Sequence, residues 1–394
     1  MDAWRVYTRI SVIEAPSPPP AIKLFLCGDV MTGRGIDQIL AHPGEPQLYE
    51  PYMRSALGYV ELARQASGPI PGAVDSDYIW GDALAELERA RPDARIVNLE
   101  TSVTRSNDAW PDKGIHYRMH PANAGCLAAA RLDCCTLANN HVLDWGRSGL
   151  AETIETLRSI GIKTAGAGGD ETEASAPAVI ELPGGRRVLV FAFAMASSGV
   201  PAGWEAKRKR SGVNLLADLS ARSVESIARK VQAVKRRGDV AILSIHWGGN
   251  WGYSISPAER EFAHRLIDAA AVDLVHGHSS HHPKGIEIHR GKAILYGCGD
   301  FLNDYEGIHG YEEFLPQLAL MYFPALDEDG QLVHFELVPV RIRRLRLERV
   351  HGADALRMRQ LLEREGLALG TRIEQASQDR LLVRVRSQTG VPPA

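Results

Sequence analysis

Five apolar runs in this chain each end at acidic, amide or imidazole side chains. In chain order these side chains are Asp29, Glu100, Asn140 with His141, His246, and the group His278, His281 and His282. Such apolar runs are typical of buried strands, and a polar side chain at the end of a strand emerges at an edge of its sheet. If the five endings share one edge, they form a metal-binding pocket. The pattern therefore predicts a sheet-based fold with a polar site at its edge.

Predicted strands and helices alternate along the first two thirds of the chain. The strands span residues 22–28, 94–99, 134–137, 240–245 and 274–277, and the main helices span residues 59–65, 78–90, 122–130, 149–160, 223–236 and 257–270. Two more strands, 179–182 and 187–193, flank Pro-Gly-Gly and predict a hairpin. Beyond residue 285 the pattern turns to β-strands. Together these elements predict an α/β protein in which two mixed sheets pack together with helices outside.

The chain has 394 residues, enough for one large domain or two ordinary ones. Residues 1–21 contain Ser-Pro-Pro-Pro and are predicted to form an extended lead-in. Residues 22–345 are predicted to form a metal-dependent catalytic domain, and residues 346–394 a helical, charged C-terminal extension. This extension either caps the domain or mediates contacts in a homodimer.

Composition and charge exclude several classes of partner. The chain is 45% hydrophobic and 24% charged, as expected for a soluble globular protein. Its formal net charge of −3 gives no electrostatic reason to expect nucleic acid or an anionic membrane as the main partner. The amino terminus has no apolar stretch long enough for a signal peptide or membrane anchor. The five cysteines lack CxxC spacing and are predicted to be buried thiols. We therefore expect a cytoplasmic protein.

The mixture of polar groups at the strand ends has a chemical meaning. Carboxylates, amide oxygens and imidazoles suit divalent Mn, Co, Fe or Zn. A single acidic residue at a strand end is more often a helix cap or turn former, and a lone histidine usually has a structural role. These simpler explanations lose force when amide and imidazole groups fall at several strand ends together. The combined pattern predicts a site for one or two divalent ions.

Six motifs surround these strand ends. They are GDVMTGRG (28–35), NLET (98–101), LANNHVLDWG (137–146), HWGGNW (246–251), GHSSHHPKGIE (277–287) and GKAILYGCGDF (291–301). In this order they resemble the CapA family of capsule or poly-γ-glutamate synthesis proteins, which lies within the calcineurin-like metallophosphoesterase superfamily. The resemblance covers about residues 22–345. It implies a four-layer α/β/β/α sandwich of two mixed sheets, the calcineurin-like fold, with two metals at the carboxyl edge of the sheets.

The resemblance also implies roles for individual residues. Carried over by position, the metal ligands would be Asp29, Glu100, Asn140, His246, His278 and His281. Glu100 would bridge the two ions, and His282 competes with His281 for the last place. His141 would act as an acid/base beside the metals, and Asp144 would orient its ring.

Three departures from the superfamily pattern put phosphate-ester hydrolysis in doubt. Phosphoesterases of this superfamily usually carry a histidine where this chain has Met31, so the first metal loses an imidazole. Their second motif is usually GDxxD, whereas here it is Asn-Leu-Glu ending at Glu100. The last motif has Ser279 and Ser280 between its histidines, where phosphoesterases have one residue.

Members of the CapA family have been linked to peptide epimerisation, so the resemblance, together with these departures, implies a metal-dependent peptide epimerase. Such an enzyme would invert a Cα centre from L to D, in a substrate expected to be a ribosomally made peptide, by metal-stabilised enolate formation and histidine acid/base catalysis. His141 would be one base, and His281 or His282 the other. The alternatives are a metal-dependent phosphoesterase or other hydrolase, and a non-catalytic subunit of capsule or poly-γ-glutamate assembly.

Substrate-facing residues are predicted from the same motifs. Arg118, in a loop that the family places near the pocket, has a planar fork suited to a carboxylate. Trp251 follows the strand that ends at His246 and would line a peptide pocket. Further candidates for a base or ligand follow a later strand; they are Asp300, Asn303, Asp304 and Glu306. The expected partner is a peptide substrate, with no nucleic acid and no membrane.

Overall fold

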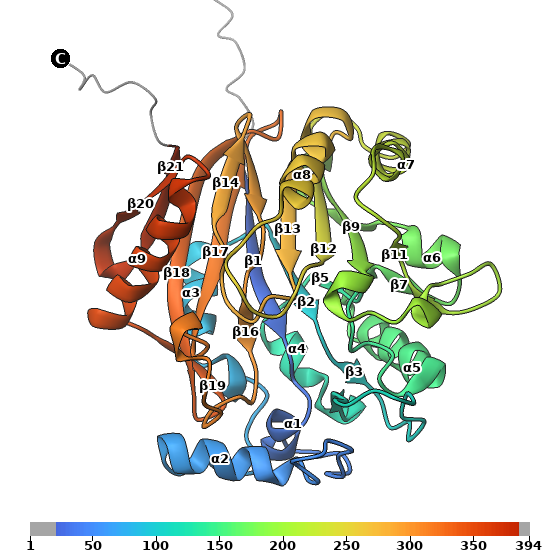
Figure 1. Ribbon diagram of the computed structural model, residues 1–394, viewed down its shortest axis with the longest axis vertical. Coiled ribbons are helices and arrows are strands. Elements are labelled where there is room, and N and C mark those ends of the chain that lie inside the picture. The colour runs from blue at the N-terminus through green and yellow to red at the C-terminus, as the bar shows by residue number, and fades with distance from the viewer. Residues whose placement is uncertain (1–20, 386–394) are drawn as a thin grey trace, which may run out of the picture.

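The computed structural model describes residues 21–385. The predicted lead-in, apart from residue 21, lies outside the described residues, and so does the end of the C-terminal extension. Two mixed sheets dominate the structure (Figure 1). No helix within residues 21–385 is long and apolar enough to cross a membrane.

The first sheet has ten strands in the order β20-β21-β18-β17-β1-β2-β5-β6, with β16 paired to β1 and β19 to β18. Its strands are β1 (Ile22–Val30), β2 (Ala94–Leu99), β5 (Cys134–Thr136), β6 (Lys163–Ala165), β16 (Asp300–Leu302), β17 (Leu318–Leu326), β18 (Leu332–Arg343), β19 (Arg346–Arg349), β20 (Thr371–Gln375) and β21 (Leu381–Val385). The central strands β1, β2 and β5 run parallel, so their carboxyl ends meet at one edge.

The second sheet has seven strands in the order β11-β9-β12-β13-β15-β14, with β8 paired to β9. Its strands are β8 (Ala178–Glu181), β9 (Arg187–Met195), β11 (Leu215–Leu216), β12 (Val240–His246), β13 (Leu274–His278), β14 (Ile286–His289) and β15 (Lys292–Leu295). The hairpin predicted around Pro-Gly-Gly is confirmed as the antiparallel pair β8 and β9. Two small two-stranded sheets, β3 (Ser102–Val103) with β4 (Arg118–Met119) and β7 (Ala167–Gly168) with β10 (Gly212–Val213), complete the strands.

Nine α-helices lie within the described residues. They are α1 (Gly35–Ile39), α2 (Leu57–Ser67), α3 (Asp82–Ala90), α4 (Gly125–Ala129), α5 (Gly146–Ser159), α6 (Glu171–Ser175), α7 (Ala221–Gln232), α8 (Pro257–Ala269) and α9 (Ala353–Leu367). The single helix predicted over 78–90 is wrong, because a short 3-10 turn (Tyr78–Trp80) precedes α3. The break falls at Gly81, whose φ is 45° and which lies against the Leu347 carbonyl oxygen, where a side chain would not fit.

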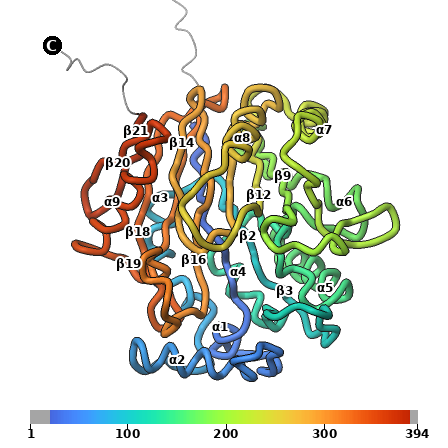
Figure 2. Tube along the Cα trace, viewed as in Figure 1, coloured from blue at the N-terminus to red at the C-terminus, as the bar shows by residue number. Residues whose placement is uncertain are grey.

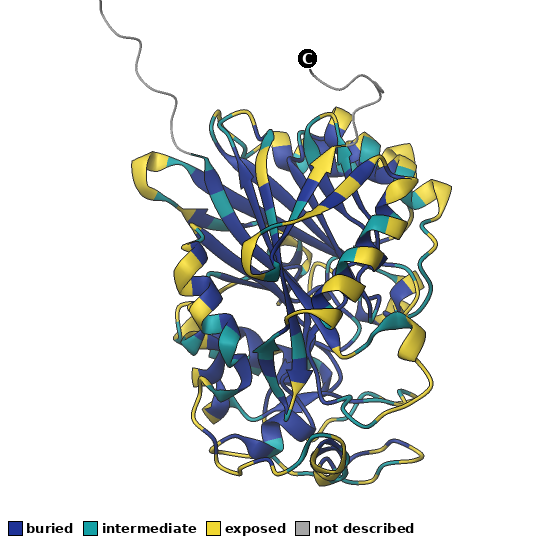
Figure 3. Ribbon diagram, turned by 90° about the vertical axis from the view of Figure 1, so that its left-hand side faces the viewer, coloured by how far each residue is buried: buried dark blue, intermediate teal, exposed yellow. Residues whose placement is uncertain are grey.

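Alternation along β9 shows how the layers are held together. Val188 and Val190 point into the core shared with the first sheet, whereas Leu189 and Phe191 point into a second core made with α7 and α8. The central strands of both sheets are accordingly buried, and exposed residues lie mainly on the helices, the loops and the edge strands (Figure 3). The two sheets thus face each other across one apolar core, and α7 and α8 cover the outer face of the second sheet.

The C-terminal segment completes the first sheet. Strand β21 pairs with β18 and β20 pairs with β21, while α9 packs against β20 and β14. The tube in Figure 2 shows this red segment beside the orange strands β17 and β18. Arg380, just before β21, donates to both carboxylate oxygens of Glu86 on α3 at 2.9 Å. The segment predicted as an extension therefore forms the edge of the main sheet.

Candidate metal centre

The carboxyl ends of the parallel strands bring the polar residues of both sheets together. Asp29 lies near the end of β1, and Glu100 directly follows β2. His246 and His278 are the last residues of β12 and β13, and the parallel register places them opposite each other. Because parallel strands end at a common edge, side chains from residues 29 to 278 meet in one buried pocket.

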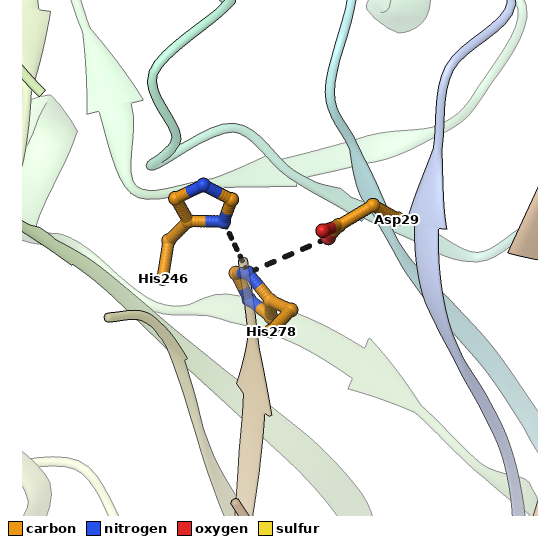
Figure 4. A group of neighbouring side chains, drawn as sticks. All are labelled: Asp29, His246 and His278. Carbon is orange, nitrogen blue, oxygen red and sulfur yellow. Dashed lines mark hydrogen bonds and ion pairs between the residues drawn. The ribbon is translucent and has the colours of Figure 1, made fainter. Parts of the chain in front are cut away.

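Asp29, His246 and His278 form the centre of this pocket (Figure 4). The Nδ1 atoms of His246 and His278 lie 2.7 Å apart, and Asp29 Oδ1 lies 3.8 Å from His278 Nδ1. Each residue offers one ligand atom, and these three atoms lie within 4.8 Å of one another. This buried group can hold a metal ion, as the strand ends predicted.

Neighbouring polar groups fix the orientation of all three residues. Ser244 Oγ lies 2.8 Å from His278 Nε2, so the other ring nitrogen faces the pocket. The Asn98 amide donates to Asp29 Oδ1 at 2.7 Å. The Asn140 side-chain oxygen lies 3.0 Å from His246 Nε2. Asn140, predicted as a ligand, thus contacts this histidine directly.

The buried carboxylates of the pocket favour the binding of a cation. Burial, followed by the charge of Asp300, raises the pKa of Asp29 to about 7. Burial and the charge of Asp29 raise the pKa of Glu100 well above its usual range. The Oε2 atom of Glu100 is buried and has no hydrogen-bond partner. Buried carboxylates with an unused oxygen beside two facing imidazoles are a donor set that a divalent ion would satisfy.

His141 stands beside this group as the motif predicted. Its Nδ1 lies 2.7 Å from Asp144 Oδ2, and its Nε2 lies 3.7 Å from Glu100 Oε1. Asp144 is fully buried, accepts the Tyr117 backbone N–H at 2.6 Å, and has its pKa raised by burial to about 6. Burial and the nearby charge of Lys113 lower the pKa of His141. Asp144 therefore orients the ring and leaves Nε2 facing the pocket.

The two histidines of the stretched motif lie in different surroundings. His281 Nδ1 lies 2.9 Å from Asp300 Oδ1; burial alone would lower the pKa of His281, but the carboxylate outweighs it and raises the pKa. His282 is buried among aromatic rings, 4.5 Å from Tyr253 and 4.7 Å from Phe314. Burial lowers its pKa to about 4. Both histidines lie near aromatic rings, but only His281 is paired with a carboxylate.

The two predicted substrate-binding residues also differ. The Arg118 guanidinium donates to the carbonyl oxygens of Ser106 and Glu45 and to the Asn107 side chain, and it lies 3.9 Å from the Trp145 ring centroid. These contacts give it a structural role in the present geometry. Trp251 lines an open cleft beside His281.

Several residues of the site were not singled out from the sequence. Lys113 Nζ lies 2.7 Å from Asp144 Oδ1 and 3.1 Å from His141 Nδ1, a contact between distant loops that no local pattern signals. Asn98 and Ser244 did leave a signal. Each lies two residues before a site residue, Glu100 or His246, and therefore on the same strand face.

Asp300 and Asp304, two of the further candidates, make different contacts. Asp300 lies opposite Asp29 in the parallel pairing of β1 and β16, which brings it to the pocket. Asp304 forms a buried ion pair with Arg34 and also accepts the Gly35 backbone N–H. Asn303 donates to Asp300 at 2.8 Å.

The fold and site define a mixed α/β protein with a buried group that can bind a metal at the carboxyl edge of its sheets. The chain belongs to the family of the bacterial capsule synthesis protein PGA_cap, whose model matches residues 23–305. The resemblance to CapA proteins drawn from the motifs is therefore confirmed.

Individual relatives carry related names. A "probable polyglutamine synthesis accessory protein" of Mycobacterium tuberculosis is 48% identical over 357 residues, covering 90% of this chain and 94% of that protein. The PGA biosynthesis protein CapA of Bacillus subtilis is 24% identical, over 80% of this chain and 70% of that protein. A solved crystal structure matches 80% of this chain and 98% of its own chain at 10% identity, with a TM-score of 0.38.

Proposed function

We propose that this protein is a metal-dependent enzyme that acts on an amide-linked chain, either a glutamyl polymer or a peptide, and that its reaction is inversion of a Cα centre. The observation that carries the proposal is the pairing of His141 with Asp144 beside the buried group of Asp29, His246 and His278. A non-catalytic role would not require a histidine with a fixed ring next to such a group.

One ion would be held by Asp29, His246 and His278, with Glu100 and Asn140 beside it. Mn, Co, Fe and Zn all suit these donors. A bound divalent ion would polarise a substrate carbonyl and so make the adjacent Cα–H more acidic. The two mixed sheets with ligands at their carboxyl edge support a calcineurin-like fold, as the family resemblance implies.

The chain's own residues would move the proton. Asp144 holds His141 at Nδ1, so Nε2 is the atom that takes up or returns a proton. Asp300 holds His281 in the same way at Nδ1. Two imidazoles held at the same ring atom are a suitable pair for removing a proton from one face and returning it to the other. Their arrangement favours His281 over His282 as the second base.

The names of the relatives support an amide substrate. They refer to the synthesis of polyglutamine and of PGA, which favours a role in polymer synthesis, whereas the lining of the cleft described below favours a peptide. Accessory action without catalysis is the second candidate function, and the word "accessory" in the name of the 48% identical relative is what favours it.

Solvent-exchange at Cα tests the reaction. The protein would be incubated in D₂O with Mn²⁺, Co²⁺ or Zn²⁺ and with γ-glutamyl oligomers or short peptides, and mass spectrometry would count deuterium. We expect one deuterium at one Cα per inverted residue, with loss of at least about 100-fold in rate for His141→Ala. His334→Ala, which removes an exposed histidine on β18, serves as the matched control. Hydrolysed products without label would instead indicate a hydrolase, and neither label nor cleavage an accessory subunit.

A further inference from the structure

A cleft of about 910 Å³ opens beside the metal centre. Its lining includes the buried Arg34 and the partly buried His281, together with Trp251, Tyr311, Tyr52 and Ile308. Most of its walls come from four parts of the chain: the segment before and within α2, the loop after β12, residues 303–317, and residues 341–343 of β18. Since His281 belongs to both the cleft and the pocket, a molecule that fills the cleft reaches the site.

The wall next to His281 is aromatic. The rings of Trp251 and Tyr311 stack with centroids 4.1 Å apart, and Trp251 lies 5.3 Å from the His281 ring. Phe314 packs behind them, 5.2 Å from Trp251. Of the other lining residues, Tyr52 is 66% exposed and Ile308 is 38% exposed. Large apolar side chains that face solvent around a cleft mark a binding surface.

The charges along the cleft argue against an anionic occupant. Arg34 is paired with Glu50 at 2.9 Å and with Asp304. Arg341 pairs with Asp354 at 3.0 Å. Arg343, the third arginine that lines the cleft, lies 3.8 Å from Glu348. A γ-glutamyl polymer carries one carboxylate per residue and would need unpaired cations here. Arg34 and Arg341 already have carboxylate partners, and Arg343 shares Glu348 with Arg344.

We propose that this cleft binds a peptide through a large apolar or aromatic side chain next to the reacting residue, and that Trp251 and Tyr311 determine this specificity. The inference rests on the proposed amide substrate and names its side-chain class. Stacking on Trp251 would hold the side chain while the backbone lies at His281.

Calorimetric titration tests the assignment without relying on turnover. The full chain, loaded with Mn²⁺, would be titrated with acetyl-Gly-Phe-Gly-amide, acetyl-Gly-Ala-Gly-amide and a γ-glutamyl trimer. We expect the phenylalanine peptide to bind about 10-fold more tightly than either of the others. Trp251→Ala and, independently, the exposed Tyr311→Ala should reduce this preference to less than about 3-fold. Tyr49→Ala is the matched control, because Tyr49 is 44% exposed and lies outside the cleft.

Three results would overturn the assignment: tighter binding of the γ-glutamyl trimer than of the phenylalanine peptide, equal affinity for all three probes, or a preference unchanged in both cleft variants. The two proposals fail separately. Binding of the phenylalanine peptide without deuterium exchange would leave the cleft assignment standing and remove the inversion reaction. Equal affinity for all three probes, with exchange still observed, would leave the reaction standing and remove the cleft assignment.

Discussion

The two sheets contribute different chemistry to the pocket where they meet. The first sheet supplies a carboxylate and amides, with Asp29 held by Asn98. The second sheet supplies imidazoles, with His278 held by Ser244. Neither sheet by itself offers the mixed donor set that borderline divalent metals favour. The metal centre is therefore a property of the contact between the sheets.

A glycine precedes the metal-facing residue in both sheets, but the space around it differs. A Cβ atom on Gly28, before Asp29, would lie 1.7 Å from the Gly299 carbonyl oxygen, which accepts the Asp29 backbone N–H. A Cβ atom on Gly277, before His278, would lie 2.5 Å from the Leu295 carbonyl oxygen. Close backbone approach thus positions both ligands, and it is tighter in the first sheet.

The largest expected effect comes from these glycines. Gly28→Ala should lower the free energy of unfolding by about 3 kcal/mol or more, because the added methyl group meets rigid backbone. Gly277→Ala should cost less, about 2 kcal/mol, since its clash is milder. Chemical denaturation measures both. Gly72→Ala, where nothing lies within 4 Å, is the control. If Gly277→Ala lowers the free energy of unfolding more than Gly28→Ala does, the backbone approach is tighter in the second sheet, contrary to this comparison.

The affinity for a divalent metal should fall more when a ligand is removed than when a residue that orients a ligand is removed. His278→Ala should weaken Mn²⁺ or Zn²⁺ binding on the order of 100-fold, because it removes one donor. Ser244→Ala and Asn98→Ala remove only the group that orients a donor, and each should weaken binding about 10-fold. Isothermal titration measures all three, with His334→Ala as control. Equal losses in Ser244→Ala and Asn98→Ala would mean that the two sheets support the ion equally, and no loss in His278→Ala would place the ion elsewhere.

The smallest effect concerns the outer edge of the first sheet, where Glu86 joins α3 to Arg380. Burial opposes ionisation of Glu86, but hydrogen bonds from Arg89 and Arg380 outweigh it and lower its pKa. A carboxylate with a lowered pKa stabilises the fold above its unfolded pKa of about 4.3, and this contribution is lost as the pH falls through the folded value.

Glu86→Gln should therefore cost about 1 kcal/mol at pH 7, and the difference from the natural protein should shrink below about pH 4. Thermal unfolding across this pH range measures the change. Glu88→Gln, on the same helix, removes a side chain that is 58% exposed and pairs with Arg131, so it should change stability little. A difference that grows toward low pH would contradict the assignment.

Much of the architecture could be predicted from local patterns. Strand β2 matches its predicted bounds of 94–99, and β1 begins at Ile22 as expected. Long apolar runs are reliable because burial on both faces leaves few other structures open to them. Short strands such as β10, β11 and β16 escaped prediction, since two or three residues carry no period and depend on their partners.

The sequence by itself determined which polar side chains stand at the ends of buried strands, because that order follows from chain connectivity and the burial of apolar residues. Only the tertiary structure decided which partners and surroundings each of these side chains has. It paired His281 with Asp300 and buried His282 among aromatic rings, although the two are adjacent. It also brought Lys113 to Asp144 and satisfied Arg118 with loop carbonyls. Such contacts join segments far apart in the chain, and their geometry depends on the packing of both sheets.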